Sequence, residues 1–162
     1  RFSGGTFRLE FYTDEEIAHI LGRSAELLGV HVTNTLLEYI AHRCRATPRT
    51  ANYLLKRCRD LAQLEGTDLS ESIIEKTFNL LEIDVCGLTG PDRSVLRVII
   101  DTFHGGPVGL NTIAAATGEE MSTIEDVLEP YLIRQGFLER TPRGRVTTSR
   151  AREHMQDVGI GS

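Results

Sequence analysis

The sequence predicts a mostly α-helical chain built from two small domains, the second of which ends in a β-hairpin. Its 162 residues allow one large domain or two small ones, and 40% hydrophobic with 25% charged residues is ordinary for a globular chain with a core. Apolar residues recur at the helical period of about 3.6 through most of the chain. The segment Asp84–Pro91 interrupts this period with two glycines and a proline, which indicates a linker.

Four helices are expected in the first domain, residues 1–84, behind a short extended segment, Phe7–Phe11. Each helix follows a residue whose side-chain oxygen can accept from a free backbone N–H: Thr13, Thr33, Thr47 and Ser70. Thr13-Asp14-Glu15-Glu16 has the spacing of a capping box, and Pro48 suits a first turn, where its missing N–H costs nothing. The inward stripes are Ile17, Ile20, Leu21 and Leu28; Leu36, Leu37, Ile40 and Cys44; Ala51, Leu54, Leu55, Cys58 and Ala62; Ile73, Ile74, Thr77, Phe78 and Leu81.

Three helices are expected next, in residues 91–162, after the linker of residues 85–90. The first opens at Pro91, the second ends at Gly118, and the third begins at a capping box, Ser122–Glu125, and stops at Gly136. Their inward residues are Val95, Leu96, Ile99 and Phe103; Leu110, Ile113 and Ala114; Ile124, Val127, Leu128, Tyr131 and Leu132.

A β-hairpin completes the second domain. The segments Phe137–Arg140 and Arg145–Thr148 flank Thr141-Pro142-Arg143-Gly144, where Pro at the second position and Gly at the fourth suit a type I turn. Three helices followed by a hairpin is the order of a winged-helix domain, a variant of the helix-turn-helix. The predicted fold class is therefore mostly α, a four-helix domain followed by a winged-helix domain.

Composition and motifs exclude several classes of function. The net charge of −5 excludes a globally basic nucleic-acid binder. The sequence has no G-x-x-x-x-G-K-[ST] phosphate loop and no Ser/His/Asp or Cys/His set with motif support, so we expect no catalytic centre within this chain. The three cysteines lack C-x-x-C spacing, which argues against a metal site and against disulfides. We expect buried, reduced thiols in a cytoplasmic protein.

Targeting segments are not expected either. No apolar run reaches the ~20 residues of a membrane helix, and no apolar stretch of the signal-peptide kind follows the N-terminus. The sequence begins with Arg1 rather than Met, so we expect a piece of a longer protein.

Charge is unevenly distributed along the chain. Residues 39–59 hold six Lys or Arg and no acid, and residues 138–152 hold five Arg and one acid. A charge run is usually a solvated face. Arg49, however, falls in the first turn of a predicted helix, where a cation opposes the helix dipole at about 0.3–1 kcal/mol. On the residues alone, Arg49 is either an anion-binding group or part of a basic surface that it shares with Lys56 and Arg59.

The predicted hairpin carries Arg140, Arg143 and Arg145 around a tight turn. Arginines on a protruding wing can straddle DNA phosphates, and they can equally form an ordinary soluble turn. Residues 119–133, which lead into and form most of the expected third helix, hold five acids and no base: Glu119, Glu120, Glu125, Asp126 and Glu129. These acids would face phosphates in a major groove, so sequence-specific reading by this helix is not expected.

Six strings are specific in combination, and the match to which they belong covers nearly the whole chain: Leu9-Glu10-Phe11-Tyr12, Arg45-Ala46-Thr47-Pro48-Arg49-Thr50-Ala51-Asn52, Gly105-Gly106-Pro107-Val108-Gly109-Leu110, Thr123-Ile124-Glu125-Asp126-Val127-Leu128-Glu129-Pro130-Tyr131-Leu132-Ile133, Gln135-Gly136-Phe137-Leu138 and Arg140-Thr141-Pro142-Arg143-Gly144-Arg145. Together they resemble the C-terminal half of the RuvB family, the bacterial Holliday-junction branch-migration motors. The resemblance implies an AAA+ lid followed by a winged helix. The first domain of the family, which holds the Walker motifs and the hairpin that meets RuvA, is absent from this sequence.

The resemblance also assigns roles to individual residues. Arg49 matches the sensor-2 arginine that acts on the γ-phosphate, and Tyr12 and Arg1 match nucleotide-contacting residues. After Arg1-Phe2 the sequence departs from the family pattern.

Wing arginines of the family contact the DNA backbone, and the matches here are Arg140 and Arg145, with Arg143 between them as a further candidate. Met121 stands where many members have a further DNA-contacting arginine.

The resemblance implies a full-length ATP-dependent DNA helicase of recombination and repair. Its ATP or ADP, with Mg, is held largely by the absent domain, through which RuvA also binds, and the full-length protein forms a homohexamer on double-stranded DNA at Holliday junctions. This chain by itself is not expected to hydrolyse ATP.

Two other interpretations of the sequence are open. The chain could be a winged-helix transcriptional regulator with a helical effector or dimer domain, but a regulator would need a basic recognition helix. It could also be a protein–protein adaptor, but that would leave the wing arginines without a role.

Overall fold

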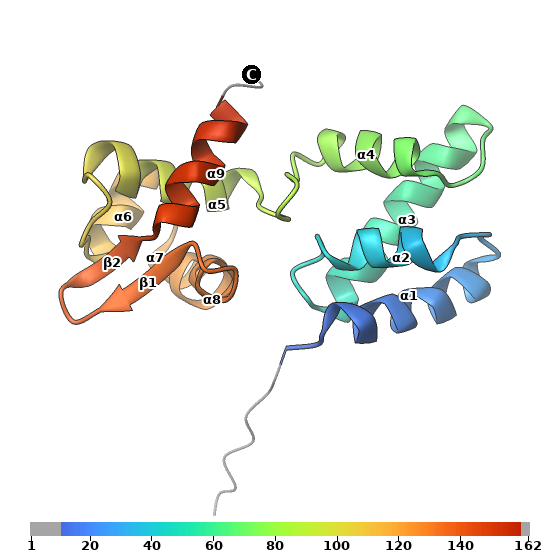
Figure 1. Cartoon of the computed structure of the whole chain (residues 1–162), viewed down its shortest axis with the longest axis horizontal. Helices are drawn as coiled ribbons and strands as arrows, with labels where there is room; N and C mark the ends of the chain where they lie inside the picture. The colour runs from blue at the N-terminus through green and yellow to red at the C-terminus, as the bar shows by residue number, and fades with distance from the viewer. Residues whose placement is uncertain (1–10, 160–162) are drawn as a thin grey trace, which may run out of the picture. The chain divides into compact units, whose positions relative to one another are not determined.

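The computed structural model describes residues 11–159. The chain divides into two compact units, the first ending at Gly87 and the second beginning at Leu88 (Figure 1). Arg1 and all but the last residue of the expected segment Phe7–Phe11 lie outside the described residues. None of the helices in the described part is long and apolar enough to cross a membrane.

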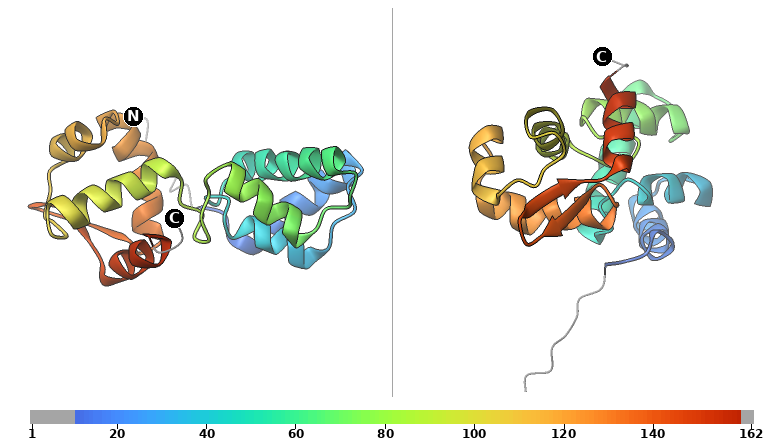
Figure 2. Two further views of the ribbon diagram at one scale, coloured as in Figure 1. Left: turned by 90° about the horizontal axis from the view of Figure 1, so that it is seen from above. Right: turned by 60° about the vertical axis from the view of Figure 1, so that its left-hand side comes forward.

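In the described residues, the first unit consists of the helices α1 (Asp14–Leu28), α2 (Asn34–Ala41), α3 (Pro48–Glu65) and α4 (Glu71–Leu80). Helix α1 packs against α2 and α3, and α3 packs against α4 (Figure 2). The four predicted caps are confirmed, since each cap hydroxyl accepts from the backbone N–H three residues further on: Thr13, Thr33, Thr47 and Ser70. Glu16 also reaches back to the Thr13 N–H at 2.8 Å, which completes the predicted capping box.

The core of this unit is built from the predicted stripes. Its largest fully buried side chains are Ile17, Leu21, Ile40, Leu54, Leu55, Ile74 and Phe78. Leu28, Leu36 and Leu81 are only partly buried at the edge of this core.

Arg43 is a buried cation in the first unit, with a side chain only 7% exposed. Its guanidinium pairs with Glu75 at 2.8 Å and donates to the Tyr39 hydroxyl at 2.7 Å. The same group lies 4.5 Å from the centre of the Tyr39 ring and 5.2 Å from that of Phe78. The interpretation of residues 39–59 as a solvated face is wrong for Arg43, because ion pairing and stacking offset the cost of burying its charge. The cluster ties α2 to α4.

The second unit, in its described residues, comprises α5 (Gly90–Arg97), the π-helical turn η1 (Val98–Thr102), α6 (Leu110–Thr117), α7 (Met121–Thr123), the π-helical turn η2 (Ile124–Leu128), α8 (Glu129–Arg134), β1 (Leu138–Thr141), β2 (Gly144–Thr147) and α9 (Ser149–Gly159). The core includes Val95, Leu96, Ile99, Ile113, Leu132 and Phe137. The winged-helix order is therefore observed, with the hairpin tip projecting beyond the helices (Figure 2).

The third expected helix differs from the prediction in two ways. It begins at Met121 with Glu120 as N-cap, so the predicted capping box Ser122–Glu125 is wrong. The Ile124 N–H already bonds to the Glu120 carbonyl at 3.0 Å, which places Ser122 inside the first turn. A π-helical turn follows, and because such a turn holds more residues than an α-helical one, it rotates the faces of the helix. Val127, predicted to face inward, is 54% exposed.

The hairpin has a third backbone segment beside it. Val108 exchanges backbone hydrogen bonds with Arg145 at 2.8 and 2.9 Å, and the Thr147 N–H donates to the Gly105 carbonyl at 2.9 Å. The close approach of this segment to the hairpin requires glycine at two positions. A Cβ on Gly106 would lie 2.3 Å from the Arg145 carbonyl oxygen, and a Cβ on Gly144 would lie 2.5 Å from the Val108 carbonyl oxygen.

Helix α9 was not predicted from the sequence. The Thr148 hydroxyl accepts from the Ala151 N–H at 3.2 Å and donates to the Gly136 carbonyl at 2.7 Å. Arg150 and His154 lie against the Phe137 ring, with the guanidinium carbon 5.1 Å and the imidazole centre 5.2 Å from its centre. The helix therefore packs on the start of the hairpin.

The three cysteine thiols differ in solvent accessibility, and this difference predicts how they react with a thiol reagent. Cys44 and Cys58 are buried, as expected, and burial raises the pKa of each to about 11. Cys86 is partly exposed. With a thiol reagent at about pH 8, we expect one rapidly reacting group in the native protein and all three after denaturation, because only the thiolate reacts. Loss of the rapid phase in Cys86→Ser is the control, and rapid reaction of two or three native thiols would contradict this burial.

Candidate functional site

Arg49 lies in the first turn of α3, directly after Pro48, and its side chain is exposed. Within residues 11–159, no side-chain hydrogen bond or ion pair to Arg49 is found. The Thr47 hydroxyl fixes the start of the helix by accepting from the Thr50 N–H at 3.3 Å. The guanidinium is thus available to an anion at the end of the helix where free N–H groups also point.

The other expected nucleotide-contacting residues are less fully described. Tyr12, which precedes the N-cap of α1, is 44% exposed, whereas Arg1 lies outside the described residues. On the expected basic face of α3, Lys56 is exposed, but Arg59 is 27% exposed and pairs with Asp60 at 2.7 Å. The hydrogen bond from Arg59 lowers the pKa of Asp60. In the part of the chain that the structure describes, His, Cys, Asp and Glu side chains form no group of three able to hold a metal ion.

In the second unit, two of the wing arginines face each other across the hairpin. Arg140 in β1 is the direct cross-strand partner of Arg145 in β2. Residues paired in this way lie on the same side of the sheet, where like charges destabilise the pairing. A buried carboxylate from another element compensates: Glu129, the first residue of α8, is 1% exposed.

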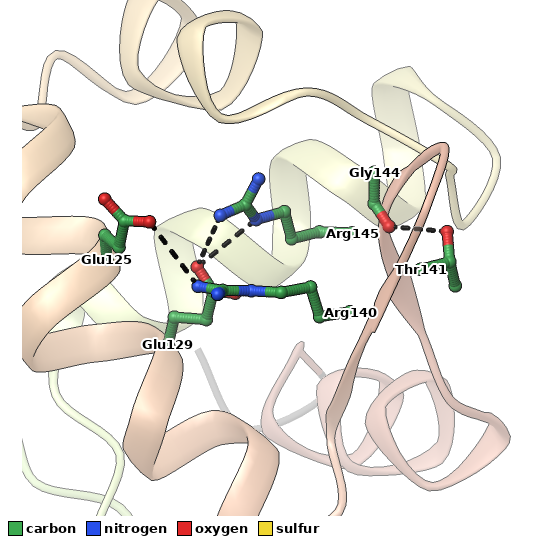
Figure 3. A network of polar contacts seen from close by, with 6 residues as sticks. All are labelled: Glu125, Glu129, Arg140, Thr141, Gly144 and Arg145. Atoms are coloured by element: carbon green, nitrogen blue, oxygen red, sulfur yellow. Dashed lines mark hydrogen bonds and ion pairs between the residues drawn. The ribbon is translucent and has the colours of Figure 1, made fainter.

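Each oxygen of the Glu129 carboxylate serves one arginine (Figure 3). Arg140 Nε donates to Oε1 at 2.6 Å, and Arg145 donates to Oε2 from Nε at 3.2 Å and from Nη2 at 3.0 Å. Glu125, one helical turn earlier, lies 3.7 Å from Arg140 Nη2 without a hydrogen bond of normal length. The Thr141 hydroxyl closes the turn by donating to the Gly144 carbonyl at 2.7 Å.

The electrostatics of this network are set by two opposing effects. Burial raises the pKa of Glu129, but the hydrogen bonds and charges of Arg140 and Arg145 together outweigh it. The pKa of the Glu129 carboxyl therefore lies below its ordinary 4.5, and the Glu129 hydrogen bond raises the pKa of Arg140. Glu129 is a carboxylate at neutral pH, and the network of Glu125, Glu129, Arg140 and Arg145 has no net charge.

Exposure separates the three predicted wing residues. Arg145 is 14% exposed with its guanidinium on Glu129, Arg140 is 51% exposed, and Arg143 at the tip is exposed. Among the described side chains, no ion pair with Arg143 is found.

Among the acids of the expected third helix, Glu120, Glu125 and Asp126 are exposed. The expectation that Glu129 lies on that acidic surface is wrong, because the turn η2 rotates it inward as it rotates Val127 outward. Glu129 is the residue that sequence reasoning missed. No local pattern identifies it, since a regular helical period places it beside the apolar stripe rather than within it.

Comparison with known proteins gives matches over both units. Residues 12–84 match the family model of the RuvB AAA lid domain, and residues 85–156 match that of the RuvB C-terminal winged helix domain. The Holliday junction branch migration complex subunits RuvB of Trichormus variabilis and of a Nostoc species are each 52% identical to this chain over 149 residues, or 91% of it. The chain spans 41% of the length of these curated relatives.

A structural neighbour agrees with these matches. The Thermotoga maritima RuvB Holliday junction branch migration motor superposes with a TM-score of 0.88 at 44% identity. The superposition covers 91% of this chain and 50% of that one.

The lowered pKa of Glu129 predicts how the stability of the hairpin depends on pH. Stabilisation by this carboxylate is complete above its unfolded-state pKa, near 4.5, and is lost as pH falls through the lowered folded-state pKa. Glu129→Gln, which cannot titrate, should be less stable than the wild type by about 1–3 kcal/mol at neutral pH. Urea denaturation followed by NMR signals of the hairpin should find that this difference shrinks below pH 4.5. A difference that stays constant across the pH range would contradict the assignment.

Proposed function

The chain belongs to the RuvB family, and on that basis we propose that it is the C-terminal part of an ATP-dependent DNA motor that drives Holliday junction branch migration in recombinational DNA repair. The observation that carries the proposal is the succession, in one chain, of a RuvB-type lid and a RuvB-type winged helix. Curated relatives that carry the name of the branch migration complex support the same conclusion. In the full-length protein the lid senses the nucleotide and the wing contacts the DNA backbone.

For the nucleotide, the residues present fit the assigned roles. Arg49 offers an exposed guanidinium without a side-chain partner in the described part of the chain, and Tyr12 is partly exposed near the start of α1. In the proposal, Arg49 acts as the sensor-2 residue, while Tyr12 and Arg1 complete the contacts to ATP or ADP. The first domain holds Mg and the phosphate loop, so this chain alone does not hydrolyse ATP.

For DNA, the wing supplies the contact. Arg140 and Arg143 are exposed enough to meet phosphates directly, whereas Arg145 is 14% exposed and binds the Glu129 carboxylate that also binds Arg140. Phosphate contacts carry no base information, which suits a motor that moves along any sequence. The exposed Glu120, Glu125 and Asp126 disfavour insertion of the third helix into a major groove, and the regulator interpretation is accordingly not favoured.

The remaining parts of the proposal concern assembly. The full-length protein works as a homohexamer in the cytoplasm on double-stranded DNA at Holliday junctions, and RuvA joins it through the first domain.

Replacement of Arg49 tests the nucleotide role in the full-length protein. Arg49→Ala should lower ATP turnover at least tenfold, since a charge-assisted contact to phosphate contributes about 1.5–3 kcal/mol. The melting temperature should stay unchanged, because the exposed side chain contributes little packing. Lys56→Ala, which removes an exposed cation from the same helix, is the matched control and should keep its turnover. Normal turnover in Arg49→Ala would refute the sensor role.

A salt series tests the wing contact. Each neutralised phosphate contributes about 0.9 to the slope of log K against log salt. The double variant Arg140→Ala/Arg143→Ala of the full-length protein should therefore lower the slope by about 1.8 and weaken binding to two unrelated duplexes alike. Fluorescence anisotropy measures both quantities, with the exposed Arg23→Ala on α1 as control. An unchanged slope, or a loss confined to one duplex, would place the contact elsewhere.

A further inference from the structure

The buried Glu129 carboxylate uses only part of the hydrogen-bonding capacity of Arg140. It accepts the Nε–H of Arg140 at 2.6 Å, whereas a guanidinium has four further N–H donors on its two Nη atoms. In the part of the chain that is described, those donors make no hydrogen bond, and the side chain is 51% exposed. Arg140 is thus hydrogen-bonded to Glu129 through Nε, while the donors on its two Nη atoms can still bind a further acceptor.

Arg145 completes this arrangement on the other oxygen. Its Nε and Nη2 both donate to Glu129 Oε2, at 3.2 and 3.0 Å, and only 14% of its side chain is exposed. Arg145 therefore fixes the carboxylate, which in turn fixes Arg140. Without the carboxylate the two guanidiniums would repel each other across the hairpin. Arg140 would then sample many rotamers, and ordering it on a phosphate would cost conformational entropy.

We propose that Glu129 is a positioning residue for DNA binding: it orients Arg140 through Nε so that the Nη groups are presented to a backbone phosphate. The proposal rests on the proposed wing contact and adds to it an acidic residue that never touches DNA. It predicts an effect opposite to that of net charge alone, since removal of a negative charge close to DNA otherwise strengthens binding.

Glu125 is the matched comparison within the same helical segment. It precedes Glu129 by one turn, is 50% exposed, and lies 3.7 Å from Arg140 Nη2, a nitrogen that donates no hydrogen bond to Glu129. At that nitrogen it competes with a phosphate instead of supporting its contact. Two acids one turn apart should therefore act on DNA affinity with opposite signs.

The experiment measures dissociation constants of a fluorescent duplex by anisotropy, with the full-length protein and a series of single and double variants. Glu129→Gln, which keeps the shape and removes the charge, should weaken binding about five- to tenfold, as expected for loss of one well-placed hydrogen-bonded contact. Glu125→Gln should bind equally or more tightly. In an Arg140→Ala background, Glu129→Gln should have no further effect, because its action passes through Arg140.

The outcomes separate the two proposals. If Arg140→Ala binds like the wild type, the wing contact itself is wrong, and the positioning role is overturned with it. If Arg140→Ala weakens binding but Glu129→Gln does not, only the positioning role is overturned. If Glu129→Gln weakens binding equally with and without Arg140, its effect is on the fold of the hairpin, which also overturns positioning.

A second variant covers the case in which Glu129→Gln does not fold. Arg140→Lys keeps the charge on an exposed side chain, but an ammonium lacks the rigid planar fork of arginine, so a contact to Glu129 does not orient its other donors toward a phosphate. We expect Arg140→Lys to bind DNA almost as weakly as Arg140→Ala. Affinity equal to that of the wild type would mean that charge alone suffices, and would overturn the proposal.

Discussion

The wing depends on one buried carboxylate shared by two arginines. An isolated two-stranded hairpin is at best marginally stable in water, and each strand here has four residues. Glu129 joins α8 to both strands at once, and the backbone bonds of Val108 to Arg145 add a third strand-like segment. Burying an ion costs several kcal/mol unless its hydrogen bonds are satisfied, and here each carboxylate oxygen has an arginine. The same interaction that fixes the hairpin therefore also fixes its charges.

This sharing changes the electrostatic character of the wing. Residues 138–152 contain five arginines, which suggests a strongly basic surface. Glu125 and Glu129 offset two of these charges, Arg140 and Arg145, so the hairpin presents fewer mobile cations and one oriented guanidinium edge. A single oriented guanidinium suits the proposed contact to single phosphates better than a high density of positive charge would. The planar fork of arginine matches the geometry of the phosphate oxygens.

Local features of the fold could be predicted from the sequence, whereas the burial of charges could not. Each of the four N-caps of the first unit depends on two residues that are three apart in the chain. A short sequence pattern is therefore enough to predict caps such as Thr13 and Ser70. The buried Arg43 pairs with Glu75, which lies 32 residues further along the chain. The buried Glu129 pairs with Arg140 and Arg145, which lie 11 and 16 residues further along. The turn η2 also breaks the period of about 3.6 on which an inward stripe is recognised. For the candidate site, motif resemblance identified the arginines but not the acid between them.

Each unit contains an ion pair in which one partner is buried, Arg43 with Glu75 in the first and Glu129 with Arg140 in the second. In the first unit, Arg43 and Glu75 lock α2 to α4, and the chain then passes through the left-handed residues Arg45 and Ala46 into the helix that begins with Pro48 and Arg49. In the second, Glu129 locks the hairpin, and Arg140 and Arg143 face solvent. Long cationic side chains lose conformational entropy when they bind a phosphate, and this cost is lower when the side chain or its backbone is already held in place. In the second unit the pair orients the proposed phosphate-binding arginine itself, and in the first it anchors the chain six residues before Arg49.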